Sequence, residues 1–531
     1  MTDLPYATRT MNLGHLLDQT AARLPDAPAM IWYDRQWTWG QMLGRVNRMA
    51  RLLACHYDVG KGDRVLVQSP NGNVMWESLW ACLKLGAIWV PANYRGAPDD
   101  LAWMVELSEP KLLICHADFP DHAARCDVPV LSIGQAAFGP DIDQLMAHCD
   151  DTRLRAADVT RDDPCWLFFT SGTTGRPKAA VLTHGQMGFV IANHLADLIP
   201  GTREGDASLV VAPLSHGAGI HAMLQVARGV VSVLPGAPRF DPAEVWALVE
   251  RHRITNLFTV PTVVKLLVEH PAVNEHDHSS LRQVIYAGAP MYRADQVRAL
   301  DALGPVLVQY FGLGEVTGCI TQLPAALHDA SETWPLEGSC GYARTAMQID
   351  VQDAQGRSLP PGETGEICVT GPAVFAGYWR NPEANAKSFR DGWFRTGDLG
   401  HMNAQGFVWL TGRESDMYIS GGSNIYPREI EEKLLMHPNV TEVAVLGMPD
   451  AKWGEIGVAV CVTRDGSQPD LSAWLMPNLA RYKMPARFVF WDELPKSGYG
   501  KITKKIIREE LQRRDAVAQG NAQLSKLGAH G

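Results

Sequence analysis

The sequence predicts an α/β fold with a large N-terminal domain of parallel βαβ layers and a small α+β C-terminal domain. Three observations support this prediction: a length of 531 residues, strand-like and helix-like segments that alternate along the chain, and changes in the residue pattern near residues 338 and 416. At about 100–200 residues per domain, this length provides several structural units. The composition, 46% hydrophobic and 20% charged, is that of a globular protein and excludes disordered, collagen-like and coiled-coil classes.

The alternation in the first part of the chain defines βαβ units. Helical patterns over residues 73–85 and 101–107 separate apolar runs that read as strands. The expected strands cover residues 64–68, 87–91, 111–115, 256–260, 283–286 and 305–309. Because strands separated by helix-length segments favour parallel pairing, this order predicts parallel sheets.

The pattern of apolar residues, Gly and Pro changes in the later part of the chain. From about Gly338 to Gly412, short alternating runs punctuated by Gly and Pro predict an antiparallel or barrel-like β section. The elements expected after Asp416 are a helix over residues 427–436, strands over residues 443–446 and 457–462, and a basic amphipathic helix over residues 501–514. We predict a large domain over residues 1–412, a hinge over 413–416, a small domain over 417–515 and a loosely ordered tail over 516–531.

Charge and cysteine content narrow the function classes. Lys plus Arg number 48 against 58 Asp plus Glu, a net charge of -10, which disfavours nucleic-acid and anionic-membrane binding. No apolar run approaches the ~18 residues of a membrane span, and Met1–Pro5 has neither the basic nor the apolar part of a secretory signal. The ten cysteines never occur as C-x-x-C, which argues against a zinc knuckle or redox pair. These features favour a cytoplasmic enzyme with reduced thiols.

A loop rich in hydroxyl groups and glycine follows the apolar run Leu167–Phe169. The loop consists of Thr170, Ser171, Gly172, Thr173, Thr174 and Gly175 and leads through Arg176 and Pro177 to Lys178. Backbone N–H groups, hydroxyl donors and one ammonium group suit a polyphosphate, although an ordinary Ser/Thr/Gly turn has a similar composition. The loop is not a Walker loop, because Ala179 stands where that motif needs Ser or Thr after its Lys.

The whole segment Thr170–Lys178 resembles the phosphate loop of the adenylate-forming superfamily, which includes acyl- and aryl-CoA synthetases, luciferase and the adenylation domains of peptide synthetases. Seven further segments resemble motifs of this superfamily and occur in its order: Tyr286–Pro290, Gln309–Glu315, Gly362–Ile367, Trp393–Asp398, Gly412–Asp416, Ser420–Pro427 and Leu494–Ile502. The match spans about residues 165–505.

The resemblance implies an ATP-dependent ligase that forms acyl-CoA. Such an enzyme converts a carboxylic acid into an acyl-adenylate with release of pyrophosphate, and then transfers the acyl group to coenzyme A with release of AMP. ATP, Mg²⁺ and coenzyme A are the implied co-substrates and cofactors, and homodimers are common among similar enzymes. Two alternatives stay open: another acyl acceptor, such as a carrier protein or an oxygenase-like reaction, and a catalytically silent protein that binds acyl-adenylate.

The resemblance also assigns roles to individual residues. Lys501, Lys178 and Glu315 are the expected catalytic residues; Lys501 would bridge the carboxylate and the α-phosphate, and Glu315 would bind Mg²⁺. The other residues expected to bind ATP or AMP are the phosphate loop, Gly288, Ala289, Pro290, Gln309, Tyr310, Phe311, Gly312, Asp398 and Arg413. The expected acyl pocket contains His216, Ala287 and Gly314, the coenzyme A site contains Gly421, Gly422 and Trp453, and the hinge is centred on Ser415. Through this hinge the small domain would be mobile, presenting Lys501 first and Gly421 and Gly422 second.

Three positions depart from the pattern of the family. Gly314 replaces the usual Thr, Phe311 replaces Tyr, and Ser415 replaces Asp or Lys. Gly314 is compatible with a slower first step or with extra room in the acyl pocket. The sequence does not distinguish aryl acids from short-chain or medium-chain acids.

The sequence argues against three other functions: a dehydrogenase, a zinc site and an amino-acid adenylation domain. Gly312–Gly318 follows a strand but has Thr317 where a dinucleotide fingerprint needs its third Gly, which argues against a dehydrogenase. His216 and His221 lack helical i,i+4 spacing and a third ligand, so a zinc site is not expected. No Asp lies between Leu209 and Pro235 to hold a substrate ammonium group, which argues against an amino-acid adenylation domain.

Overall fold

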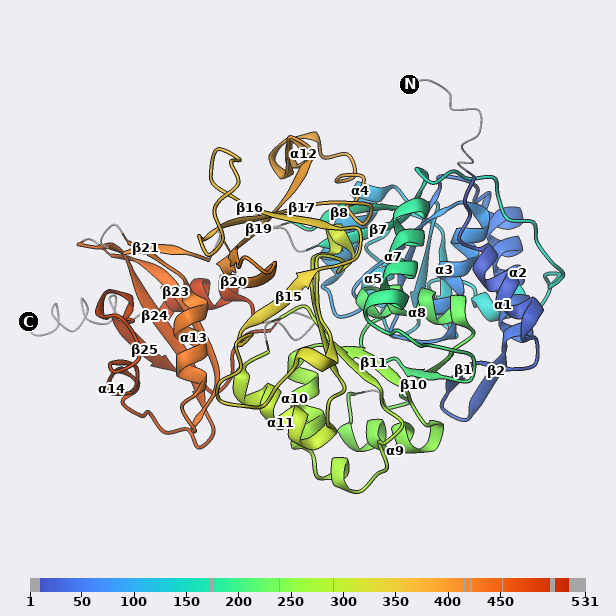
Figure 1. Ribbon diagram of the computed structural model, residues 1–531. Helices are drawn as coiled ribbons and strands as arrows, with labels where there is room; N and C mark the ends of the chain where they lie inside the picture. Colours follow the sequence, from blue (N-terminus) through green and yellow to red (C-terminus); the bar gives the residue numbers. More distant parts are fainter. Residues whose placement is uncertain are drawn as a thin grey trace, which may run out of the picture. The chain divides into compact units, whose positions relative to one another are not determined.

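The computed structural model contains two compact units (Figure 1). It describes residues 10–170, 176–237, 239–289, 291–413, 416–420, 423–450, 452–496 and 502–514. The large unit comprises Met1–Asp350, Cys368–Thr396 and Asn403–Val408, and the small unit comprises Val351–Ile367, Gly397–Met402 and Trp409–Gly531.

One sheet of the large unit has six strands in the order β6-β5-β3-β4-β7-β8. Its strands are β3 (Arg64–Gln68), β4 (Ile88–Pro91), β5 (Leu112–His116), β6 (Val130–Ile133), β7 (Pro164–Thr170) and β8 (Lys178–Thr183). All neighbouring pairs are parallel except β7 and β8, which form an antiparallel hairpin. The βαβ units expected around residues 64–115 are therefore confirmed, with α3 (Asn73–Leu85) and α4 (Pro98–Ser108) as their helices.

A second sheet of the large unit contains the order β15-β14-β13-β12-β11-β9-β10-β1-β2. Its strands are β1 (Pro28–Trp32), β2 (Arg35–Thr38), β9 (Ala207–Leu209), β10 (Val231–Leu234), β11 (Asn256–Thr259), β12 (Gln283–Tyr286), β13 (Leu307–Phe311), β14 (Thr321–Leu323) and β15 (Ser339–Ala343). The parallel strands β11, β12 and β13 are those expected from the sequence. They pack on a core that includes Trp246, Leu257 and Val284.

The large unit has further helices besides α3 and α4. They are α1 (His15–Arg23), α2 (Trp39–Tyr57), α5 (Pro120–Ala123), α6 (Ile142–Met146), α7 (His184–Asp197), α8 (Gly217–Arg228), α9 (Pro242–His252), α10 (Pro261–Glu269), α11 (Arg293–Leu303) and α12 (Pro382–Ser388). Short 3₁₀ turns are η1 (Pro271–Asn274), η2 (Gly314–Val316) and η3 (Ala325–Leu327). Among the described residues, no helix is both long and apolar enough to span a membrane.

Two glycines at the start of α8 allow this helix to lie close to neighbouring side chains. A Cβ atom on Gly217 would lie 2.5 Å from Cε1 of Phe258, and one on Gly219 would lie 2.9 Å from Cη2 of Trp166 and closer still to a backbone oxygen. Only residues without a side chain fit there. This packing holds His216, the N-cap residue of α8, at the end of the helix.

The section between residues 338 and 413 contains the expected short strands. After β15 come β16 (Gln348–Gln352), β17 (Gly365–Thr370), β18 (Phe389–Arg390), β19 (Trp393–Met402) and β20 (Phe407–Arg413). Within the described part of the chain, the strand order is open and no closed barrel is formed. The prediction of short strands in this section is confirmed, whereas the barrel-like arrangement is corrected to an open one, in which β18 and β19 pair antiparallel.

The small unit is an α+β structure built around a five-stranded sheet. Its strands are β21 (Tyr418–Ser420), β22 (Ser423–Ile425), β23 (Val440–Asp450), β24 (Gly454–Thr463) and β25 (Arg487–Phe490), and its helical segments are α13 (Pro427–Leu435), α14 (Leu471–Leu475), the 3₁₀ turn η4 (Arg481–Lys483) and residues 504–514. Because side chains alternate along a strand, Val443 of β23 packs in a core with Ile430 of α13, whereas Ala444 packs in another with Ile507.

Candidate active site

The β7–β8 hairpin brings the two ends of the phosphate loop together. Thr170, at the end of β7, is paired with Lys178, at the start of β8. The loop residues Ser171, Gly172, Thr173, Thr174 and Gly175 lie outside the described residues. The described flanks therefore place one hydroxyl group and one ammonium group at the same end of the hairpin.

Glu315 lies beside this hairpin end. It belongs to the 3₁₀ turn η2 and its exposed fraction is 5%. Its Oε1 atom accepts a hydrogen bond from Thr170 Oγ1 at 3.0 Å and another from Tyr378 Oη at 2.9 Å. Thr170 precedes Glu315 in the sequence and Tyr378 follows it, so the two hydrogen bonds anchor the carboxylate to two separate chain segments. A carboxylate that binds a ligand needs such partners to hold its orientation.

Tyr378 is a site residue that the sequence analysis missed. It lies between β17 and α12, where its backbone forms an isolated bridge with Ala180 of β8. Its hydroxyl group contacts Glu315, and Lys178 Nζ lies 4.2 Å from the centre of its ring. A cation over an aromatic face is held by the ring quadrupole, so Tyr378 positions both expected catalytic residues of the large unit.

The sequence signal for Tyr378 is weak. Tyr378 follows Gly377, which has a φ of 118° that other residues rarely adopt. Asn385 of α12 then holds the Tyr378 backbone, because its Oδ1 accepts from Tyr378 N at 2.6 Å and its Nδ2 donates to Tyr378 O at 3.2 Å. These contacts depend on chain segments that no local pattern brings together.

The segment expected to face adenine follows β12. Ala287 is buried, Gly288 has a φ of 83° and Ala289 is half-buried, while Pro290 lies outside the described residues. Tyr286 Oη donates to Gln309 Oε1 at 3.3 Å, so the Gln309 side chain is held within the large unit. The neighbouring strand β12 thus anchors the Gln309 side chain, and its role in nucleotide binding stays a prediction.

Along β13 the expected nucleotide-binding residues lie on different faces. Tyr310 is buried, and its ring is stacked at 5.7 Å on Phe258. Phe311 is half-buried and paired with Thr321 of β14. Gly312 has no room for a side chain, because a Cβ atom there would lie 2.5 Å from the Gly318 Cα. Of these residues, Phe311 has the accessible ring that stacking on adenine requires.

His216 and Gly314 both lie against Phe168 of β7. The His216 ring meets the Phe168 ring edge-on at 4.9 Å, and its Nδ1 lies 3.1 Å from Ser215 Oγ. A Cβ atom on Gly314 would lie 2.5 Å from Cε1 of Phe168. The space beside Gly314 is thus filled by an aromatic ring.

In the small unit, Asp398 and Arg413 form an ion pair. Arg413 Nε donates to Asp398 Oδ1 at 2.9 Å, and the exposed fraction of Asp398 is 6%. A carboxylate can accept hydrogen bonds from ribose hydroxyl groups, and a guanidinium group can donate to hydroxyl or phosphate oxygens. The pair therefore has the chemistry that the predicted ribose site requires.

The expected coenzyme A residue Trp453 is exposed at 49%, with Lys452 Nζ 4.9 Å from its ring centre. Lys501, the hinge residue Ser415, and Gly421 and Gly422 lie outside the described residues. Their predicted roles stay predictions.

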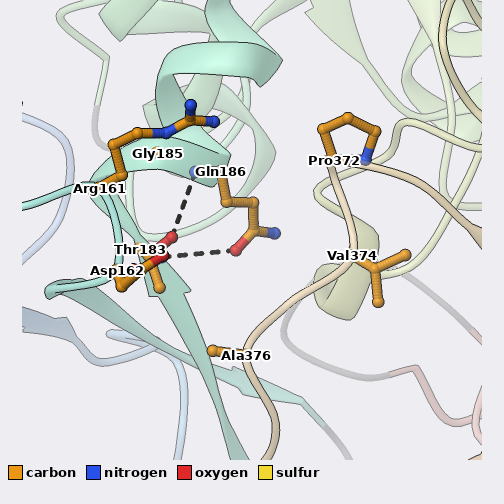
Figure 2. Close-up of a pocket in the computed structure, with 8 residues that line it drawn as sticks. All are labelled: Arg161, Asp162, Thr183, Gly185, Gln186, Pro372, Val374 and Ala376. Atoms are coloured by element: carbon orange, nitrogen blue, oxygen red, sulfur yellow. Dashed lines mark hydrogen bonds between the residues drawn. The ribbon is translucent and has the colours of Figure 1, made fainter. Parts of the chain in front are cut away.

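A pocket with a volume of about 270 Å³ lies near the end of β8 at Thr183. Figure 2 shows the side chains that line it. It is lined by Arg161, Asp162, Thr183, Gly185, Gln186, Pro372, Val374 and Ala376. Thr183 and Gln186 form the capping box that starts α7, and Gln186 Nε2 donates to Ala373 O at 2.7 Å. This pocket contains none of the expected site residues, and two of its polar residues, Thr183 and Gln186, cap α7.

Comparison with known proteins shows the family. The model for the AMP-binding enzyme matches residues 17–379, and the model for the AMP-binding enzyme C-terminal domain matches residues 429–501. A feruloyl-CoA synthase from an Amycolatopsis species is 38% identical over 95% of this chain and 100% of its own length. An indoleacetate–CoA ligase from Aromatoleum aromaticum is 32% identical over 96% and 100%.

A solved structure of o-succinylbenzoate CoA synthetase from Bacillus subtilis, in complex with its acyl-adenylate intermediate, has a TM-score of 0.83 and 30% identity over 95% of this chain and 98% of that one. The chain belongs to the AMP-binding enzyme family. The predicted superfamily and the predicted class, an AMP-forming acid–thiol ligase, are confirmed.

Proposed function

We propose that this chain activates an aromatic carboxylic acid with ATP and transfers the acyl group to coenzyme A. The observation that carries the proposal is the cluster in which Glu315 accepts hydrogen bonds from Thr170 and Tyr378 while Lys178 lies over the Tyr378 ring. The cluster places a carboxylate, a hydroxyl group and an ammonium group beside the loop that resembles a phosphate loop. The relatives named for feruloyl and indoleacetate substrates support an aromatic acid.

The chemistry explains why such a cluster is needed. A carboxylate is a poor electrophile, because its charge repels nucleophiles and oxide is not a leaving group. When a carboxylate oxygen attacks the α-phosphorus of ATP, pyrophosphate leaves and a mixed anhydride forms. The thiolate of coenzyme A then attacks the acyl carbon and AMP leaves, so that a thioester forms. Lys178, and by resemblance Lys501, would stabilise the negative charge on the phosphate oxygens.

Glu315 is the residue that would hold Mg²⁺. Both hydrogen bonds to its side chain end on Oε1, and an oxygen donor suits a hard dication. The described residues contain no group of three His, Cys, Asp or Glu side chains arranged for a metal ion. This fits Mg²⁺, which proteins usually hold through one or two carboxylates together with substrate phosphates. When bound, Mg²⁺ supplies charge neutralisation on the phosphates.

A second candidate differs only in the acceptor. A fatty acid–[acyl-carrier-protein] ligase from Streptomyces coeruleorubidus is 33% identical over 92% of this chain and 94% of its own length. That name supports a variant of the proposal in which the acyl group passes to a carrier protein. Operation in the cytoplasm, a homodimer and a hinge at Ser415 are further predictions that accompany either acceptor.

The experiment that tests the proposal measures pyrophosphate release with a panel of carboxylic acids, with and without coenzyme A, while mass spectrometry identifies the acyl product. The panel contains benzoates, cinnamates, indole-acetate and linear acids of two to twelve carbons. We expect acid-dependent pyrophosphate release, highest for aromatic acids, and a thioester only in the presence of coenzyme A. A linear acid as the best substrate would contradict the aromatic assignment, and pyrophosphate release without thioester would favour another acceptor.

A further inference from the structure

One face of strand β7 carries a row of aromatic rings that leads to the Glu315 cluster. Side chains alternate along a strand, so Trp166, Phe168 and Thr170 share a face. The Trp166 and Phe168 ring centres lie 5.7 Å apart, and the Phe168 ring meets His216 edge-on at 4.9 Å. Thr170, the last residue of the row, donates to Glu315. A substrate that lies along this row, with its carboxylate near Thr170, would contact Phe168.

Phe168 and Gly314 fit each other sterically. A Cβ atom on Gly314 would lie 2.5 and 2.6 Å from Cε1 and Cδ1 of Phe168 and 2.9 Å from Cγ2 of Thr170. Real Cβ atoms essentially never approach other heavy atoms more closely than 3.0 Å. Phe168 is 8% exposed, so its ring has little free space into which it could move. A side chain at residue 314 therefore requires Phe168 or Thr170 to shift.

We propose that Phe168 is a specificity-determining residue, paired with Gly314, and that its ring limits the size of the acyl group at the carboxylate end. This inference rests on the proposed function. The sequence left two explanations open for Gly314: a slower first step, or extra room in the acyl pocket. The inference rejects the second explanation, because the Phe168 ring occupies the space that a side chain at residue 314 would fill. Together with His216, the ring offers an aromatic edge to a planar acid.

The test compares four variants with the native protein on the panel of acids. Phe168→Leu should raise kcat/KM for acids that carry one more substituent near the carboxylate, relative to the best native substrate, by about tenfold or more, since one methylene group in an apolar pocket changes discrimination by roughly 10–200-fold. The KM for ATP should change less than about threefold, because the nucleotide contacts are retained. Gly314→Thr should lose about tenfold or more in kcat/KM for every acid, because the core is overpacked.

The double variant Phe168→Leu/Gly314→Thr isolates the pair. If the two residues share one volume, the double variant should recover most of the activity that Gly314→Thr loses, and the double-mutant cycle should show strong coupling. Phe169→Leu is the matched control: this ring lies on the opposite face of β7, in the core beneath β8, and its replacement should leave the ranking of acids unchanged.

Three outcomes would overturn the inference. The first is an unchanged ranking of acids in Phe168→Leu, and the second is additivity of the two changes in the double variant. The third is a folded Gly314→Thr protein, as judged by its melting temperature, with native kcat/KM. If Gly314→Thr does not fold, recovery of folding in the double variant supports the pair and its absence contradicts it. Native protein without acid-dependent pyrophosphate release would instead overturn the proposed function itself, which a change of ranking alone does not affect.

Discussion

At the scale of single residues, the hydrogen bonds around Glu315 define the candidate site in the large unit. Thr170 and Tyr378 both donate to Oε1, so the carboxylate is oriented before any substrate arrives. Preorganised groups of this kind stabilise charge without rearranging during the reaction. The effect of the carboxylate charge can be separated from that of its hydrogen bonds by one variant that removes the charge and another that removes a single hydrogen bond.

Glu315→Gln should raise the Mg²⁺ concentration for half-maximal pyrophosphate release by about tenfold or more, because a neutral amide oxygen is a poorer ligand for a hard dication. Tyr378→Phe keeps the carboxylate and removes one hydrogen bond, so it should lower turnover with a smaller shift of the Mg²⁺ titration. The measurement is a Mg²⁺ titration at saturating ATP and acid. Identical titrations of native protein and Glu315→Gln would remove the metal-binding role.

A second prediction concerns His221, which lies in the interior on α8 and is stacked at 4.5 Å on Phe258. Burial, together with the nearby Arg344, lowers the pKa of His221 from 6.5 to about 3. Between these two pH values the unfolded chain binds a proton that the folded chain does not. Stability is therefore fully present above pH 6.5 and falls as the pH is lowered toward 3, by up to about 1.4 kcal/mol per pH unit.

His221→Phe should remove this contribution while keeping the stack on Phe258. As the pH is lowered from 8 to 5, the melting temperature of the variant should rise relative to that of the native protein. Melting temperatures of both proteins at each pH provide the measurement. A difference that does not change with pH would show that His221 does not gain a proton on unfolding in this range.

At the scale of elements, the sequence predicted the strands better than their contacts. The apolar runs at residues 64–68 and 283–286 became strands at those positions, because strand and helix patterns are local. The approach of Tyr378 to Glu315 and of Phe168 to Gly314 depends on how separate segments pack, which spacing along the chain does not encode. Gly314 could thus be recognised as a departure from the family pattern, while its steric reason needed the structure.

The start of α8 gives a prediction at this scale. Gly219→Ala would place a Cβ atom 2.9 Å from Trp166 Cη2 and against the Leu214 backbone oxygen, so it should destabilise the protein by about 1–3 kcal/mol. Gly44→Ala in α2 is the matched control. Its Cβ atom would make an ordinary contact at 3.5 Å from Asp151, and alanine should stabilise the helix by about 0.5–1 kcal/mol. Urea titrations should show shifts of opposite sign; equal shifts would contradict the packing argument.

At the scale of the whole molecule, the proposed reaction has two half-reactions, and the family resemblance assigns them to two orientations of the small domain about Ser415. A hinge works when one or two residues absorb a large φ/ψ change. Ser415→Pro would fix φ near −65° at that residue and restrict the residue before it. We expect one half-reaction to survive and the other to collapse.

Single-turnover pyrophosphate release and thioester formation from supplied acyl-adenylate measure the two half-reactions separately. A melting temperature near that of the native protein would exclude unfolding as the cause of any loss. Native rates in both half-reactions would place the hinge elsewhere, and an equal loss in both would indicate a structural defect.

The central claim, that the acid is activated as an adenylate, is tested most directly by following oxygen atoms. The protein is incubated with ATP, coenzyme A and a substrate acid in which both carboxylate oxygens are ¹⁸O. One labelled oxygen should leave with AMP when the thiolate displaces it, and the other should stay in the thioester carbonyl. Mass spectrometry should therefore find AMP that carries one ¹⁸O atom. Unlabelled AMP, or ADP together with labelled phosphate, would contradict the account.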